Sequence, residues 1–263
     1  AYIAAKARLL AFQGPEDWAI LGWDDPNAWA LREQVRGHLA GFGLTPPPAG
    51  VAGVFLQDGW FWWRPARAGQ EDVPLLEEAH VQLRGRHNRL NVAAALAAAY
   101  VLGLTREHMR AGVEGFTGVP HRLELVRVHR GVAWYNDSIA TSPARVLAAL
   151  EAFPEEPIVL LAGGRDKHLP WDELARAIRQ RVHALIVFGE AADLIRGAVE
   201  AAPGPGPKHL LHVPDLQQAV AQAARLAPPG SVVLLSPGCA SFDQFRNFEE
   251  RGEKFRQWVR ALP

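Results

Sequence analysis

The chain has 263 residues, about half of them hydrophobic, so it can bury one large core or two modest cores, and we expect two. Its 28 lysine and arginine residues balance 28 acidic residues, which leaves no basic surface for a phosphate backbone and excludes nucleic acid as a partner. The apolar runs are shorter than the roughly 18 residues of a membrane span, so we expect no membrane insertion, and the single cysteine excludes an internal disulfide and fits a reducing cytoplasm.

The first 118 residues predict strands mixed with helices. We expect a strand at residues 18–22, a helix at 28–38, strands at 51–56 and 60–63, and helices at 88–102 and 106–116. Asp58 and Gly59 supply the positive φ angles of a two-residue hairpin turn. Thr105 is expected to cap the second helix. The aromatic residues of the 60–63 strand favour packing against a helix over a stacking platform for bases.

From residue 119 onward, strands and helices alternate. A hairpin is expected at 123–135, and helices at 143–153, 171–179, 191–201, 216–226 and 248–262 then alternate with strands at 158–161, 184–188, 209–213 and 232–235. This order predicts a parallel, doubly wound sheet with helices on both faces.

Polar residues follow three of these strands, at residues 136–138, 163–167 and 239–248. The carboxyl ends of parallel strands meet at one edge of a sheet, where ligands bind. The pair Gly163 and Gly164 could let the backbone approach a ligand closely, Lys167 suits a carboxylate or phosphate, and Asp137 can accept two hydroxyl hydrogens, as a ribose presents them. Taken singly, these residues have structural alternatives. Residues 136–138 could form a helix-entry turn, Lys167 could be a solvated lysine, and Ser241 of the third segment could be a helix cap.

The sequence contains no G-x-x-x-x-G-K-[ST] phosphate loop, and it opens on Ala1 instead of Met. We interpret it as the rear part of a larger protein and expect it to be inactive alone.

Five motifs occur in one succession: residues 85–91 (GRHNRLN), 120–124 (PHRLE), 135–141 (YNDSIAT), 163–167 (GGRDK) and 236–252 (SPGCASFDQFRNFEERG). In this order they resemble the Mur ligases, and the last stretch resembles the glutamate-adding members. The resemblance implies an α/β fold in which residues 1–118 are the rear part of a central ATPase domain. Residues 119–263 would then form a Rossmann-like, doubly wound C-terminal domain.

The resemblance also implies a reaction. An ATP-dependent amide ligase would add glutamate, as the D-isomer, to UDP-N-acetylmuramoyl-L-alanine through an acyl phosphate, with Mg²⁺, in the peptidoglycan precursor synthesis of the cytoplasm. We expect a monomer. The alternatives are a sister Mur ligase, a folylpolyglutamate-type ligase, or a non-catalytic module that binds a nucleotide.

Site residues follow from the same resemblance. It assigns nucleotide contacts to Asn88, Asn91, Arg122 and Asp137, and contacts with the incoming glutamate to Thr141, Lys167, Ser241, Phe242 and Phe248. Lys6 occupies the place of a carbamylated lysine, whose carbamate oxygens could hold magnesium. Catalytic roles fall to Lys6, Arg122 and Lys167.

Structural alternatives remain for several of these residues. Asn88 could be a helix cap, and Lys6 a solvated helix residue. Ile139 stands where the family pattern often has lysine, so it contributes no charge to the site. Cys239 is expected to be a small core residue and not a nucleophile.

Overall fold

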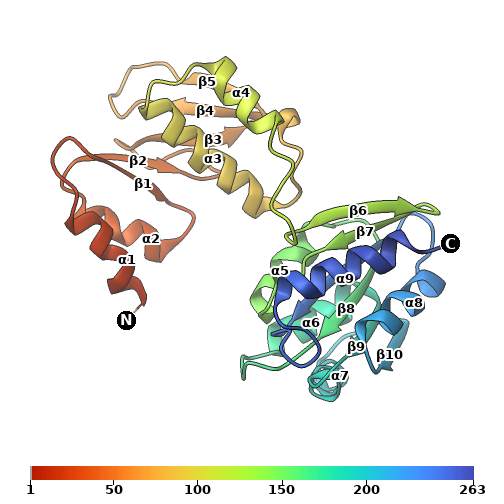
Figure 1. The fold of residues 1–263 in the computed structure, drawn as a ribbon. Coiled ribbons are helices and arrows are strands. Elements are labelled where there is room, and N and C mark those ends of the chain that lie inside the picture. The colour runs from red at the N-terminus through yellow and green to blue at the C-terminus, as the bar shows by residue number, and fades with distance from the viewer. Residues whose placement is uncertain (1) are drawn as a thin grey trace. The chain divides into compact units, whose positions relative to one another are not determined.

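The structure is a computed structural model that describes residues 2–263, and the chain divides after Thr117 into two compact units (Figure 1). Each unit has its own sheet, with one apolar core in the first unit and two in the second. Within residues 2–263, no helix combines the length and the apolar character that crossing a bilayer requires.

The first unit holds a mixed sheet with the strand order β1-β2-β3-β4-β5. Its elements are α1 (Tyr2–Ala11), β1 (Trp18–Gly22), α2 (Pro26–Ala30), β2 (His38–Phe42), β3 (Ala52–Gln57), β4 (Trp60–Arg64), β5 (Val73–Glu77), α3 (Arg86–Val101) and α4 (Arg106–Glu114). Strands β1, β2 and β3 are parallel, and β4 and β5 continue the sheet in antiparallel fashion. The Trp63 ring stacks on Tyr100 of α3 at 4.3 Å, which confirms the packing expected for the aromatic strand.

One expectation for this unit was wrong, and one further strand was missed. The helix predicted at 28–38 ends as α2 at Ala30, passes through a 3₁₀ turn (Leu31–Gln34), and is followed by β2. Strand β2 needs Gly41, because a Cβ there would lie 2.6 Å from the Trp23 ring. Strand β5 was not predicted, since Pro74 weakens its strand pattern; β5 lies at the sheet edge, where proline is tolerated.

The second unit is a doubly wound α/β sandwich with the strand order β10-β9-β8-β11-β7-β6. Its elements are β6 (Glu124–His129), β7 (Val132–Asn136), α5 (Pro143–Glu151), β8 (Ile158–Gly163), α6 (Asp172–Arg181), β9 (Val182–Phe188), α7 (Ala192–Ala201), β10 (His209–Val213), α8 (Leu216–Leu226), β11 (Val232–Gly238) and α9 (Phe248–Arg260). The sheet is parallel except for β6, which pairs with β7 as the expected hairpin.

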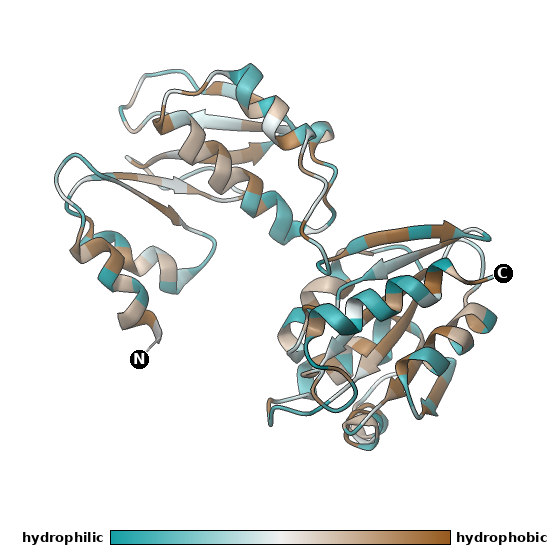
Figure 2. Cartoon of the chain, viewed as in Figure 1, coloured by the Kyte–Doolittle hydropathy of each residue, from teal (hydrophilic) through white to brown (hydrophobic). Residues whose placement is uncertain are grey.

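Helices cover both faces of this sheet. One apolar core lies between the sheet and α5, α6 and α7, and the other lies between the sheet and α8 and α9. The central strands β8 and β11 are buried along their whole length, and Figure 2 shows the outer helix α9 as largely hydrophilic. The continuous apolar runs in the sequence therefore mark strands that are covered on both sides.

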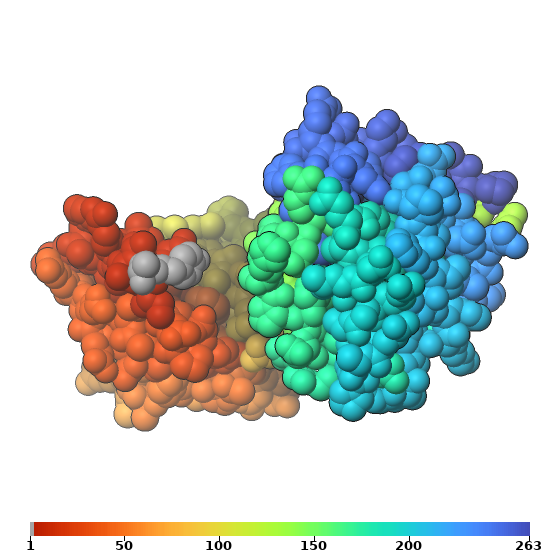
Figure 3. Space-filling view, turned by 90° about the horizontal axis from the view of Figure 1, so that it is seen from below, coloured from red at the N-terminus to blue at the C-terminus, as the bar shows by residue number. Residues whose placement is uncertain are grey.

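We expect residues 118–263 to fold alone, because they contain a complete sheet covered by helices on both faces, with two cores of their own. The front unit should not, because β1 lies at the edge of its sheet and two apolar side chains are exposed, Leu9 of α1 (70%) and Phe12 directly after α1 (80%). Figure 3 shows the N-terminal segment, in red, at the surface. Thermal unfolding of the two pieces checks this. A cooperative transition from residues 1–117 and none from 118–263 would reverse the assignment.

Candidate functional site

Three polar segments meet at one edge of the second sheet. Strands β7, β11 and β8 are neighbours, and each is followed by one of the segments predicted from the sequence. The amide of Arg165 donates to the Ala240 carbonyl at 2.8 Å, and the Ala240 amide donates back at 3.0 Å. The Gly238 amide donates to the Ala140 carbonyl at 2.8 Å. The predicted convergence at the carboxyl ends of the strands is therefore present.

The glycine pair after β8 serves the packing of backbone against backbone. A Cβ on Gly163 would lie 2.0 Å from the Phe188 carbonyl oxygen, and one on Gly164 would lie 2.2 Å from the Ala240 carbonyl oxygen. Both glycines also have positive φ angles. Neighbouring strand ends therefore fill the space that side chains would take here, and the approach of a ligand to this backbone stays a prediction.

Lys167 and Thr141 are in direct contact at this edge, although 26 residues separate them in the sequence. The ammonium of Lys167 donates to the Thr141 hydroxyl at 2.9 Å. Ser241 follows β11 and is 2% exposed, whereas Phe242 next to it is 61% exposed. Phe248 begins α9 and is half-buried. A cation, two hydroxyls and aromatic rings thus lie in the three segments or, for Thr141, three residues after the first of them, a set suited to an acidic ligand with an apolar stem.

Asp137 is buried directly after β7 and is already hydrogen bonded. One carboxylate oxygen accepts from the Leu123 amide at 3.2 Å, and the other accepts from the Ser236 hydroxyl at 2.8 Å. Burial raises the pKa of Asp137 to about 7, and the bonds from Ser236 and Leu123 oppose that rise. The residue is only 4% exposed, so the chain itself takes up much of the accepting capacity that the sequence suggested for a ribose.

Arg122 stands exposed between two residues with positive φ angles, His121 at 64° and Leu123 at 44°. The His121 amide donates to Glu124 at 2.9 Å, and the His121 carbonyl accepts from the Ile139 amide at 3.1 Å. The Leu123 amide is held by Asp137. This sharp corner therefore fixes the backbone on both sides of Arg122, and Arg122 contributes to keeping the pKa of Asp137 from rising further.

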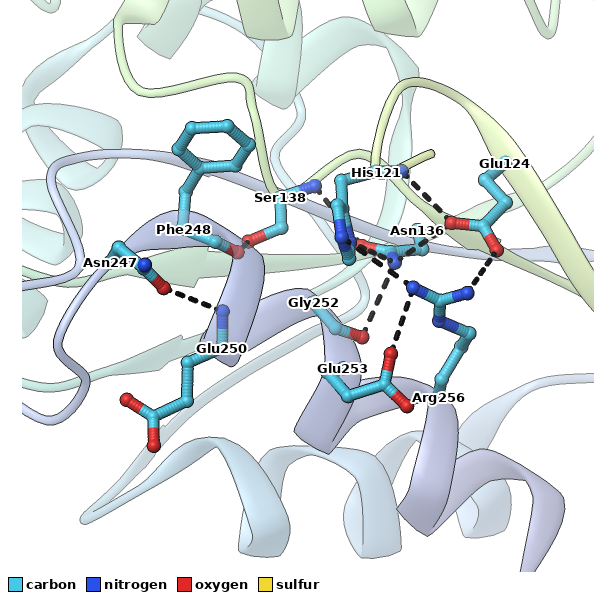
Figure 4. Close-up of polar contacts among 10 residues, drawn as sticks. All are labelled: His121, Glu124, Asn136, Ser138, Asn247, Phe248, Glu250, Gly252, Glu253 and Arg256. Atoms are coloured by element: carbon cyan, nitrogen blue, oxygen red, sulfur yellow. Dashed lines mark hydrogen bonds and ion pairs between the residues drawn. The ribbon is translucent and has the colours of Figure 1, made fainter. Parts of the chain in front are cut away.

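A buried network holds the corner against β7 and α9 (Figure 4). The side-chain amide of Asn136 lies 3.0 Å from His121 Nδ1 and donates to the Gly252 carbonyl at 3.3 Å. Burial and the Arg256 guanidinium lower the pKa of His121, so the neutral ring can accept from Asn136. Arg256 forms an ion pair with Glu124 at 3.2 Å. Helix α9 therefore contacts the corner directly, through the Gly252 carbonyl and the Arg256 side chain.

Gly252 lets α9 approach this network. A Cβ there would lie 2.2 Å from His121 Nδ1 and 3.0 Å from the Asn136 side chain. We expect Gly252→Ala to destabilise the protein by about 1–3 kcal/mol through overpacking, in spite of alanine's higher helix propensity. Urea unfolding measures the effect. Gly197→Ala on α7 is the matched control: its Cβ meets nothing within 4 Å, so it should be neutral or stabilising, and equal effects of the two changes would contradict this reading.

The remaining predicted residues lie in the first unit. Gly85 is the N-cap of α3, so the interpretation of Asn88 as a cap was wrong. The Asn88 side chain donates instead to the Arg84 carbonyl at 2.7 Å. Asn91 donates to Asn88 at 3.3 Å. Lys6 lies exposed on α1. In the part of the chain that the structure describes, no three His, Cys, Asp or Glu side chains gather as a metal site would require.

Sequence reasoning did not identify Ser236 or Arg251. Arg251 is fully buried beneath the strand ends, on the same face of α9 as Phe255 and Val259. The sequence did contain a signal for it: Arg251 is spaced four and eight residues from the apolar Phe255 and Val259, which places it on the buried face of the helix. Cys239 is buried as expected, and burial raises the pKa of its thiol to about 12, which leaves it unreactive.

Known proteins with similar sequences are ligases. Residues 121–239 match the family model described as Mur ligase, glutamate ligase domain. The chain is 44% identical over 261 residues to the UDP-N-acetylmuramoylalanine–D-glutamate ligase of Symbiobacterium thermophilum, covering 99% of this chain and 56% of that protein. The ligase of the same name from a Roseiflexus species is 43% identical over 268 residues, covering 100% and 57%. The chain thus spans little more than half the length of these relatives.

Solved structures are similar in fold. A pseudomurein peptide ligase type C from Methanothermus fervidus matches with a TM-score of 0.67 at 14% identity, covering 100% of this chain and 59% of that one. Folylpolyglutamate synthase from Mycobacterium tuberculosis matches with a TM-score of 0.65 at 16% identity, covering 99% and 60%. These likenesses confirm the α/β fold with two mixed sheets.

Proposed function

The chain belongs to the Mur ligase family, and from this premise we propose that it is the rear part of an ATP-dependent ligase that adds D-glutamate to UDP-N-acetylmuramoyl-L-alanine. The observation that carries the proposal is the group formed by Lys167, Thr141 and Ser241 at the carboxyl ends of the strands. An acidic amino acid needs a cation and hydroxyl donors for its carboxylates, and these side chains supply both.

Each predicted residue then has a task. Lys167 and Ser241 hold the carboxylates of the incoming glutamate, Thr141 keeps the Lys167 ammonium in place, and the Phe242 and Phe248 rings flank the apolar stem. In the second unit, Arg122 and Asp137 are the proposed contacts of the nucleotide. In the first unit, Asn88 and Asn91 are proposed to contact a nucleotide as well. The acyl phosphate made with ATP is attacked by the amine that this grouping orients.

Magnesium would accompany the ATP in such a reaction. Lys6, as its carbamate, is the ligand we propose, but residues 2–263 hold no other group of metal-binding side chains to complete the site.

The test is amide formation by the full-length ligase from UDP-N-acetylmuramoyl-L-alanine, D-glutamate and ATP, with release of ADP and phosphate. We expect labelled D-glutamate to enter the product, and the 263-residue chain alone, which lacks the phosphate loop, to give none. Incorporation of a different amino acid in place of D-glutamate would favour a sister ligase and overturn the substrate assignment.

A further inference from the structure

Arg251 is a buried cation without a carboxylate in contact. It lies in the first turn of α9, is 0% exposed, and none of its hydrogen-bond acceptors in residues 2–263 is an acidic side chain. Burial lowers the pKa of Arg251 to about 10, with Asp243 acting in the opposite direction, so the guanidinium stays charged at neutral pH. A buried charge is costly unless its donors are satisfied, so its partners have to be in place.

Those partners belong to two segments of the candidate site. Nε donates to the Ser138 hydroxyl at 2.9 Å, and one terminal nitrogen donates to the Ser138 carbonyl at 2.8 Å. Both terminal nitrogens donate to the Cys239 carbonyl at 3.2 Å. The Ser138 hydroxyl in turn donates to the Phe248 carbonyl at 2.8 Å. One planar group therefore joins the end of β7, the end of β11 and the start of α9.

This arrangement fixes both ends of residues 239–248. Cys239 is the first residue of that segment and Phe248 the last, and between them lie Ser241 and Phe242. The guanidinium also lies directly beneath Gly164, since a Cβ there would be 3.1 Å from its Nη1 atom. The loop that carries the glutamate contacts thus has no freedom to shift at either end without breaking bonds to a buried charge.

We propose that Arg251 is a positioning residue for the acidic amino acid: it holds the 239–248 segment so that Ser241 and Phe248 face the ligand together with Lys167. The ligand part of this inference rests on the proposed function, whereas the hold on the segment does not. Arg251 itself, being fully buried, does not touch the ligand.

Amide hydrogen exchange of the 263-residue chain tests the hold without any ligand. We compare Arg251→Gln and Arg251→Lys with Arg127→Gln, a matched control because Arg127 also donates to backbone carbonyls, at the far end of α9. In both Arg251 variants, exchange should accelerate about tenfold or more at residues 239–248, and strands β8 and β9 should be unchanged. Equal acceleration throughout the unit, or wild-type protection in Arg251→Lys, would overturn the proposal.

Titration with D-glutamate tests the ligand part. Arg251→Gln should weaken D-glutamate binding about tenfold, Arg127→Gln should stay within about twofold, and ADP binding should be the same in both. If wild type binds D-glutamate and Arg251→Gln binds it equally well, the positioning role is wrong. If wild type binds none, the proposed function fails instead, and the exchange result still decides whether Arg251 holds the segment.

Discussion

Lys167→Ala is expected to raise the Michaelis constant for the amino acid about ten- to hundredfold in the complete ligase and to leave that for ATP nearly unchanged. The reason is the loss of one charge-assisted hydrogen bond to a carboxylate, which contributes roughly 1.5–3 kcal/mol. The Thr141 hydroxyl, which accepts from Lys167 at 2.9 Å, would remain but carries no charge. Initial-rate measurements with each substrate varied in turn give the two constants.

Lys208→Ala is the matched control. Lys208 is an exposed lysine just before β10, at the opposite edge of the same sheet, so neither constant should change. Asp137→Ala should show the reverse bias, raising the constant for ATP and leaving the one for the amino acid unchanged. If the Lys167→Ala enzyme binds ATP weakly and the amino acid normally, Lys167 contacts the nucleotide and the assignment to the amino acid is wrong.

Asp137→Asn is expected to remove a pH dependence of stability. The pKa of Asp137 is raised from 3.8 to about 7 in the folded protein, so the folded state holds the proton more tightly than the unfolded state. The stabilisation of the folded state that comes from protonated Asp137 is fully present below about pH 4 and is lost as the pH rises to about 7. This corresponds to about 4 kcal/mol in the free energy of unfolding.

Asparagine is close to isosteric and can still accept from Leu123 and bond to Ser236, so the variant should gain stability relative to wild type as the pH rises. Urea unfolding at pH 5 and pH 8 gives the difference between the two proteins. Asp172→Asn, at an exposed position of α6, should show no such gain. A pH-independent difference for Asp137→Asn would mean that its carboxylate is ionised in the folded state throughout.

The second sheet could be predicted nearly completely because its buried strands are short apolar runs separated by amphipathic helices. The first sheet was predicted less well. Strand β2 contains Gly41, against which Trp23 packs, and β5 begins at Val73 just before a proline, so tertiary contacts and not local pattern decide both.

The positions of Lys167, Thr141 and Ser241 at one edge followed from strand order alone. The hydrogen bonds by which Arg251 fixes the site could not be predicted from strand order, because they depend on which face of α9 turns inward. The same holds for the glycine pair, since only the pairing of β8 with β9 and of Arg165 with Ala240 shows that Gly163 and Gly164 meet backbone. The sequence pattern thus predicts where the site lies, whereas its rigidity depends on packing that the pattern does not reveal.

The central claim is that the strand ends of the second unit hold an acidic amino acid. An NMR titration of the 263-residue chain with D-glutamate tests it most directly, with D-glutamine as the neutral comparison. We predict that D-glutamate shifts the amide signals of Thr141, Lys167 and Ser241 in a saturable way and that D-glutamine does so much more weakly. Saturable shifts that map to the first unit, or equal responses to the two amino acids, would contradict the account.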